Sequence, residues 1–134
     1  MPQFDVTIIG AAASQAQKAV LFEKITDLMV NVLGRTRKAV VVSVTSVPAS
    51  DWASGGTSQP DGKLVGIQAV VKILAGTNTD AQKAQMIAEA SALLREVLGE
   101  PAMPLYVTFT EIPAESWGYD GRTVADMRRP RAAS

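Results

Sequence analysis

Neither cysteine nor histidine occurs among the 134 residues of this chain. Their absence excludes disulfides, thiol nucleophiles, zinc sites built from cysteine and histidine, and Ser-His or Cys-His catalytic pairs. Any catalytic group must then be a carboxylate, a lysine, an arginine, a tyrosine, a hydroxyl group or a chain terminus. We therefore expect neither a metal site nor a cofactor.

The sequence also lacks a net charge and a long apolar run. Thirteen basic and 13 acidic side chains balance, so neither nucleic acid nor an anionic membrane is an expected partner. The one local excess of charge, at Arg128, Arg129 and Arg131, is interpreted as a solvated chain end. No apolar stretch approaches the length of a membrane span, and the first residues lack the pattern of a signal peptide. These absences predict a cytoplasmic protein.

What the chain does contain is an internal repeat. When the sequence is shifted against itself by 65 residues, 18 positions are identical without a gap. Residues 16–19 and 81–84 both read Ala-Gln-Lys-Ala, residues 32–34 and 97–99 both read Val-Leu-Gly, and Trp52 falls on Trp117. Self-similarity at one fixed spacing indicates a duplicated structural unit.

Each half has the same predicted order of elements. Short β-branched runs at 4–9 and 67–74 predict strands. Capping-box patterns at 14–17 and 79–82 predict helix starts, and the helices are expected to end at Leu33 and Leu98. Helical spacing predicts their buried faces, namely Ile25, Leu28, Met29 and Val32 in the first and Ile87, Ala90, Leu94 and Val97 in the second. Second strands are expected at 39–47 and 105–112.

The predicted fold class is α/β (α+β), with two tandem β-α-β units that form a four-stranded sheet with both helices on one face. One domain spans 1–134: a first unit at 2–58, a linker at 59–66, a second unit at 67–123 and a tail at 124–134. Apolar residues are expected on both sides of the strands, so oligomerisation would cover the other face of the sheet. A ferredoxin-like domain has the same element order, which leaves that fold open.

Four features resemble the tautomerase superfamily. They are Pro2 directly after the initiator, a strand that leads into a capped helix, a second strand that ends near residues 110–113, and hairpins rich in glycine and aromatics that begin at Trp52 and Trp117. The chain is similar to a fused form in which two 4-oxalocrotonate-tautomerase (4-OT)-like units share one chain. This resemblance, from Pro2 to about Arg129, implies a tautomerase/MIF-like fold.

The resemblance implies that Met1 is removed and that the free secondary amine of Pro2 acts as general base or general acid. A prolyl amine is normally protonated at neutral pH. Burial in an apolar pocket and neighbouring cations would lower its pKa toward the working pH, where a base transfers protons most efficiently. The counterpart of Pro2 in the second half is Ile67, which lies inside the chain. Each chain therefore provides one catalytic amine.

The chain departs from the best-known pattern of this family at two arginines. Ala12 and Thr77 occupy the positions that match the first arginine, and Val41 and Tyr106 those that match the second. Efficient use of 4-oxalocrotonate is therefore in doubt. Side chains that could bind a substrate carboxylate or wall the pocket are instead predicted to be Arg35, Arg37, Lys38, Trp52, Lys72, Tyr106, Trp117 and Arg122.

The leading hypothesis is an isomerase that converts an enol such as a 2-hydroxydienoate or phenylenolpyruvate to its keto form. The expected partners are a small-molecule carboxylate and, by resemblance, two further copies in a homotrimer. A dehalogenase, hydratase or decarboxylase on the same scaffold is an alternative, with Glu111 or Asp120 as groups that could activate water. A third hypothesis is a non-catalytic oligomeric binding module.

Overall fold

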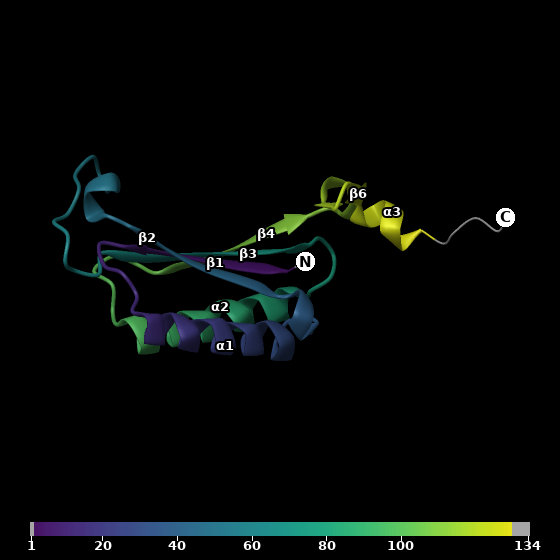
Figure 1. The fold of residues 1–134 in the computed structure, drawn as a ribbon, viewed down its shortest axis with the longest axis horizontal. Coiled ribbons are helices and arrows are strands. Elements are labelled where there is room, and N and C mark those ends of the chain that lie inside the picture. The colour runs from purple at the N-terminus through teal and green to yellow at the C-terminus, as the bar shows by residue number, and fades with distance from the viewer. Residues whose placement is uncertain (1, 130–134) are drawn as a thin grey trace.

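The computed structural model describes residues 2–129. Its main sheet has the strand order β2-β1-β3-β4, and Figure 1 shows the two long helices side by side against one face of it. The principal elements are β1 (Gln3–Ile9), α1 (Gln15–Asn31), β2 (Val41–Val47), β3 (Gly66–Leu74), α2 (Asp80–Leu98) and β4 (Tyr106–Ile112). This arrangement confirms the two β-α-β units and the helices on one face.

Strand directions follow from the crossovers. β1 pairs with β2 in parallel, β3 pairs with β4 in parallel, and β1 and β3 are antiparallel at the centre. Asp5 lies opposite Val70, and these two residues are 65 positions apart, so the repeats are related by an approximate two-fold axis between them. In a ferredoxin-like fold the β-α-β units are split by another strand. Here the two strands of each unit pair directly, which excludes that alternative.

The helices bury one stripe each against the sheet. β1 contributes Phe4, Val6 and Ile8, and these side chains are at most 1% exposed. The expected buried face of α2 was wrong at one position, because Ile87 is 37% exposed whereas Met86 is completely buried. Met86 lies four residues before Ala90, so the same stripe is kept when the face is rotated by one residue.

Both predicted capping boxes are present. The Ser14 hydroxyl accepts a hydrogen bond from the Gln17 amide at 3.1 Å, while the Gln17 side chain accepts one from the Ser14 amide at 2.9 Å. Thr79 and Gln82 repeat this geometry at the start of α2. At the end of α1 the chain turns at Gly34, whose φ of +70° is strained for other residues.

The sheet face away from the helices is more polar than expected. Strand alternation places Asp5 of β1, Ser43 of β2 and Lys72 of β3 on it. Its exposed apolar residues include Val41 and Val70, which are 42% and 36% exposed. The apolar pattern on both sides of the strands is therefore only partly present, and cover of this face by other copies stays a prediction.

A C-terminal arm, residues 113–129, extends from the end of β4 (Figure 1). It contains η3 (Ala114–Ser116), β5 (Gly118–Tyr119), β6 (Arg122–Thr123) and α3 (Val124–Arg128). Thus the predicted tail at 124–134 begins with a helix, and its last five residues, Arg131 included, lie outside the described residues. Within residues 2–129, the helices are too short or too polar to span a membrane. The cytoplasmic location remains a prediction.

Candidate functional site

Pro2 lies directly before β1 and is half-buried. Its carbonyl oxygen accepts a hydrogen bond from the Val41 amide at 3.0 Å, which ties it to the start of β2. On the other side Gln3 pairs with Lys72, so the antiparallel register places Pro2 opposite the last residues of β3. Met1 lies outside the described residues, and its removal stays a prediction.

The strand directions bring several predicted site residues to this end of the sheet, which we call the Pro2 end. The starts of β1 and β2 meet the ends of β3 and β4 here. Arg35 follows α1, and Arg37 and Lys38 form η1 (Arg37–Ala39) just before β2. Lys72 lies two residues before the end of β3. One end of the sheet therefore collects Pro2 and four of the predicted cations.

Two of the predicted cations are already paired with carboxylates. The Arg37 guanidinium lies 2.7 Å from Asp27, and the Arg122 guanidinium in the C-terminal arm lies 3.1 Å from Asp126. All four side chains remain well exposed, so each pair contributes little to stability. The pairing reduces the charge that Arg37 and Arg122 offer to a ligand.

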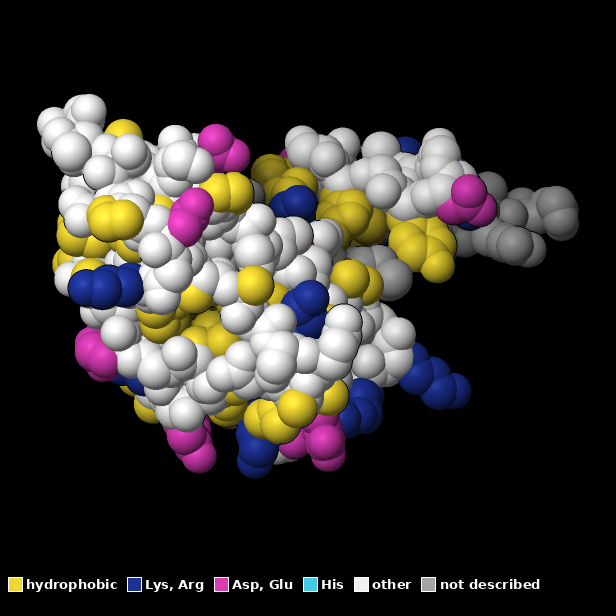
Figure 2. Space-filling view, turned by 60° about the vertical axis from the view of Figure 1, so that its left-hand side comes forward, with side chains coloured by type: hydrophobic (Ala, Val, Ile, Leu, Met, Phe, Trp, Pro, Cys, Tyr) yellow, Lys and Arg dark blue, Asp and Glu magenta, His cyan; other side chains and the backbone are white. Residues whose placement is uncertain are grey.

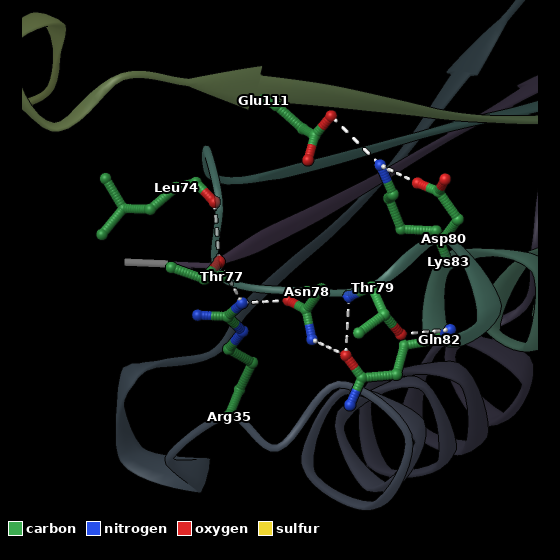
Figure 3. A network of polar contacts seen from close by, with 9 residues as sticks. All are labelled: Arg35, Leu74, Thr77, Asn78, Thr79, Asp80, Gln82, Lys83 and Glu111. Atoms are coloured by element: carbon green, nitrogen blue, oxygen red, sulfur yellow. Dashed lines mark hydrogen bonds and ion pairs between the residues drawn. The ribbon is translucent and has the colours of Figure 1, made fainter.

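Arg35 has a different environment. Its Nη2 donates to the Thr77 hydroxyl at 2.6 Å and to the Asn78 side-chain oxygen, while its Nε is buried without a hydrogen-bond partner among the described residues. Figure 3 shows the guanidinium reaching from the loop after α1 to these two neutral groups. Burial, and then the nearby charge of Arg128, lower the pKa of Arg35 from its ordinary value.

The two neutral partners of Arg35 are themselves held in place. The Asn78 side-chain nitrogen donates to the Leu33 carbonyl at 2.9 Å and to the Gln82 side chain at 3.0 Å. The Thr77 hydroxyl donates to the Leu74 carbonyl at 2.6 Å. The guanidinium orientation is therefore fixed by contacts that reach the loop after α1, the start of α2 and the end of β3. Figure 3 shows the contacts to α2 and β3.

The opposite end of the sheet, related to the Pro2 end by the repeat, lacks these features. The counterparts of Arg35, Thr77 and Asn78 are Glu100, Ala12 and Ala13. Glu100 forms an ion pair with Arg95 at 3.1 Å. The cationic cluster is thus specific to the end of the sheet that carries Pro2.

The linker closes this opposite end. The Gly62 amide donates to the Gly10 carbonyl at 3.1 Å, and the Val65 amide donates to the Ile9 carbonyl at 2.9 Å. Gly10 is required here, because its φ is +89° and a Cβ would lie 2.3 Å from the Lys63 carbonyl oxygen. Ile67, the counterpart of Pro2, is completely buried.

The three aromatic residues predicted for the site do not surround Pro2. Two lie at the opposite end of the sheet, and one lies in the C-terminal arm. Trp52 packs with Ile9 and Val65 at the far end of β1. Tyr106 begins β4 and is 55% exposed. Within one chain neither reaches Pro2. Trp117 lies in the C-terminal arm, which begins on the same side of the sheet as Pro2, and its carbonyl accepts from Val124 at 2.9 Å.

The two carboxylates considered for water activation also have structural environments. Glu111 pairs with Lys83 at 3.2 Å, which connects β4 to the first turn of α2. These contacts, together with Asp80, raise the pKa of Lys83 above its ordinary value. Asp120 is exposed in the turn between β5 and β6 at a φ of +49°.

The sequence interpretation missed Asn78. Asn78 differs from its counterpart Ala13, so the comparison of the repeats contained a signal for it. Arg128 was interpreted as part of a solvated end, and its side chain is exposed.

The family model for the tautomerase enzymes matches residues 2–61 and 69–127 of the chain. The chain belongs to the tautomerase family. This tautomerase is similar to a solved structure described as native fused 4-OT, with 30% identity over 95% of this chain and 99% of that chain and a TM-score of 0.81. The match confirms the resemblance and the fold predicted from the sequence.

Other solved structures share the architecture of this tautomerase. An asymmetric trimer described as F6 fused 4-OT is 27% identical over 95% of this chain and 99% of that chain, with a TM-score of 0.80. N1, a member of the cis-3-chloroacrylic acid dehalogenase family, is 21% identical over 90% of this chain and 82% of that chain, with a TM-score of 0.74. The latter likeness shows the fold alone. None of the curated proteins compared with the chain matches it.

Proposed function

We propose that this tautomerase is an isomerase that transfers a proton between the enol oxygen and a conjugated carbon of a small 2-hydroxy-alkenoate or arylenolpyruvate. Pro2 acts as the general base and then as the general acid after loss of Met1. The observation that carries the proposal is the asymmetry between the repeats. Pro2 lies half-buried at a cationic end of the sheet, whereas its counterpart Ile67 is buried beneath apolar residues and a linker.

The reaction needs one base and one anion-binding group. The Pro2 nitrogen accepts the proton of the enol hydroxyl, so the O–H bond breaks and the C–O bond becomes a carbonyl. The conjugated carbon then takes a proton from the resulting prolinium, which forms the C–H bond without net oxidation. A nearby cation binds the substrate carboxylate and stabilises the enolate charge. Arg35, Arg37, Lys38 and Lys72 are the predicted residues at this end.

Trp52 and Tyr106 lie far from Pro2 within one chain, so we propose that they reach the site of another copy in the assembly. Fused 4-OT structures are described as trimers, and we extend this assembly to the present chain as a homotrimer. Tyr106, exposed at the start of β4, and Trp52 could then border Pro2 of another copy. Exposed apolar side chains on the C-terminal arm, Tyr119 and Met127, each 45% exposed, provide surface for such contacts (Figure 2). Light scattering that gave a monomer at working concentration would refute the trimer.

The test of the activity compares the wild-type chain with a Pro2→Ala variant on phenylenolpyruvate. The wild type should ketonise the enol above the rate in solution, and the variant should lose about 100-fold or more, the usual contribution of a general acid–base group. A primary amine remains in this variant. Pro2→Leu, whose large side chain prevents removal of Met1, provides a second form without a free amine at position 2, once intact mass confirms that Met1 is retained. Equal rates in all forms would refute the proposal.

Two alternatives have direct assays. Release of halide from a three-carbon halo-acid would favour the dehalogenase interpretation, and release of carbon dioxide from a three-carbon acid would favour the decarboxylase interpretation. In this chain Glu111 is paired with Lys83, which leaves that carboxylate less available for activating water. A mature chain that retains Met1 would favour the non-catalytic binding module, because an acylated nitrogen is not basic.

A further inference from the structure

The cations at the Pro2 end differ in how much charge they offer to a ligand. Arg37 and Arg122 each contact a carboxylate within the chain. Arg35 contacts only the neutral side chains of Thr77 and Asn78. A guanidinium held by neutral acceptors keeps its full charge, and its planar group of donors matches a carboxylate.

The site is also preorganised. Asn78 is fixed by the Leu33 carbonyl and by Gln82, so the guanidinium that it orients loses little freedom when a ligand binds. The Nε of Arg35 is buried and has no hydrogen-bond partner in residues 2–129. A ligand is therefore expected to meet the Nη edge of the guanidinium rather than this atom.

The charge of Arg35 is not neutralised by a carboxylate. No acidic residue in 2–129 forms an ion pair with it, in contrast to Arg37 and Arg122. A ligand carboxylate would therefore be the first anionic partner of this guanidinium.

The position of Arg35 suits a substrate of Pro2. Thr77 hydrogen-bonds back to Leu74, and the register places Leu74 next to the residue opposite Pro2. With about 3.3 Å per residue along a strand, Arg35 lies on the order of 10 Å from Pro2. A carboxylate bound by Arg35 is therefore near enough for the adjacent carbons of a small arylenolpyruvate to reach the amine.

We propose that Arg35 binds the carboxylate of a 2-oxo or 2-enol acid, and that Asn78 is the positioning residue for Arg35. This inference rests on the proposed function for the role of the ligand as substrate. Its binding test does not require turnover. Arg37, Lys38 and Arg122 then have a minor part in carboxylate binding.

The experiment measures binding by calorimetry with phenylpyruvate and with its uncharged methyl ester. Arg35→Gln should weaken binding of the acid by about 10- to 100-fold, the range of a charge-assisted hydrogen bond. Binding of the ester should change less than about 3-fold in this variant. Arg95→Gln is the matched control, because it removes an arginine at the opposite end of the sheet.

The role of Asn78 is tested by the ratio of acid to ester binding. Asn78→Ala should lower this ratio while the thermal midpoint, followed in parallel, reports any loss of folding. Arg35→Lys keeps the charge but not the planar donors, and it should retain part of the preference for the acid. A structural role alone would change acid and ester binding equally.

The outcomes separate this inference from the proposed function. A Pro2→Ala variant that binds the acid as the wild type does but does not catalyse ketonisation supports both. Acid binding that depends on Arg35 in a chain without ketonisation activity supports the anion site and refutes the isomerase. Acid binding that is absent from the wild type, or unchanged in Arg35→Gln, overturns the proposed anion site.

Discussion

A substitution at Gly10 tests whether the linker closes the opposite end of the sheet. Gly10→Ala introduces a Cβ at 2.3 Å from the Lys63 carbonyl oxygen and 2.8 Å from Val65 Cγ2, in a backbone with φ +89°. The left-handed conformation costs about 1–2 kcal/mol for alanine, and overpacking adds about 1–3 kcal/mol. The predicted total loss in the free energy of unfolding is therefore about 2–5 kcal/mol.

The matched control is Gly55→Ala. Gly55 has φ +59°, but nothing lies within 4 Å of the position of its Cβ, so only the conformational cost of about 1–2 kcal/mol applies. Both variants are compared by urea unfolding at one fixed chain concentration, because assembly makes stability depend on concentration. If Gly10→Ala were no more destabilising than Gly55→Ala, the close packing of the linker against β1 would be refuted.

Three further predictions concern the helices. Thr79→Ala removes the cap of α2 and should cost about 1 kcal/mol by urea unfolding, whereas an unchanged midpoint would contradict the observed capping box. Met86→Ala should cost about 2–5 kcal/mol and Ile87→Ala less than about 1.5 kcal/mol, and the reverse order would restore the face expected from the sequence. Its contacts with Glu111 and Asp80 raise the pKa of Lys83 in the folded chain. The stability that the pair with Glu111 contributes is therefore fully present below the ordinary pKa of 10.5 and is lost as the pH rises through the raised pKa. Wild type and Lys83→Gln should therefore differ in unfolding midpoint at pH 9 and converge at higher pH, and a constant difference would argue against this linkage.

The repeat made most of the fold predictable. The first and last residues of β4 each follow those of β2 by 65 positions, and the N-cap of α2 follows that of α1 by the same number. This agreement arises because each unit repeats the same strand, cap and helix pattern. The buried face of α2 was misplaced by one residue since alanines at several positions of this helix leave its apolar stripe poorly defined. Met86 and Ile87 are both apolar, and only packing against the sheet distinguishes them.

The site was predictable only where sequence order places residues together. Arg35, Arg37 and Lys38 precede the strand that pairs beside Pro2, so their common location followed from a parallel β-α-β unit. The location of Arg128 depends on the path of the C-terminal arm, which no local sequence pattern specifies. The neutral partners of Arg35 depend on a contact between the loops that follow α1 and β3.

The central claim is that the mature chain carries an unblocked Pro2 amine at the cationic end of the sheet, with a reduced tendency to hold a proton. A nitrogen NMR titration of chain labelled at proline tests it most directly, because an amine and an amide nitrogen differ in chemical shift and only the amine titrates. The account predicts an amine signal for Pro2 whose midpoint lies below that of a solvent-exposed prolyl amine. An amide signal from retained Met1, or a midpoint equal to that of the exposed amine, would contradict it.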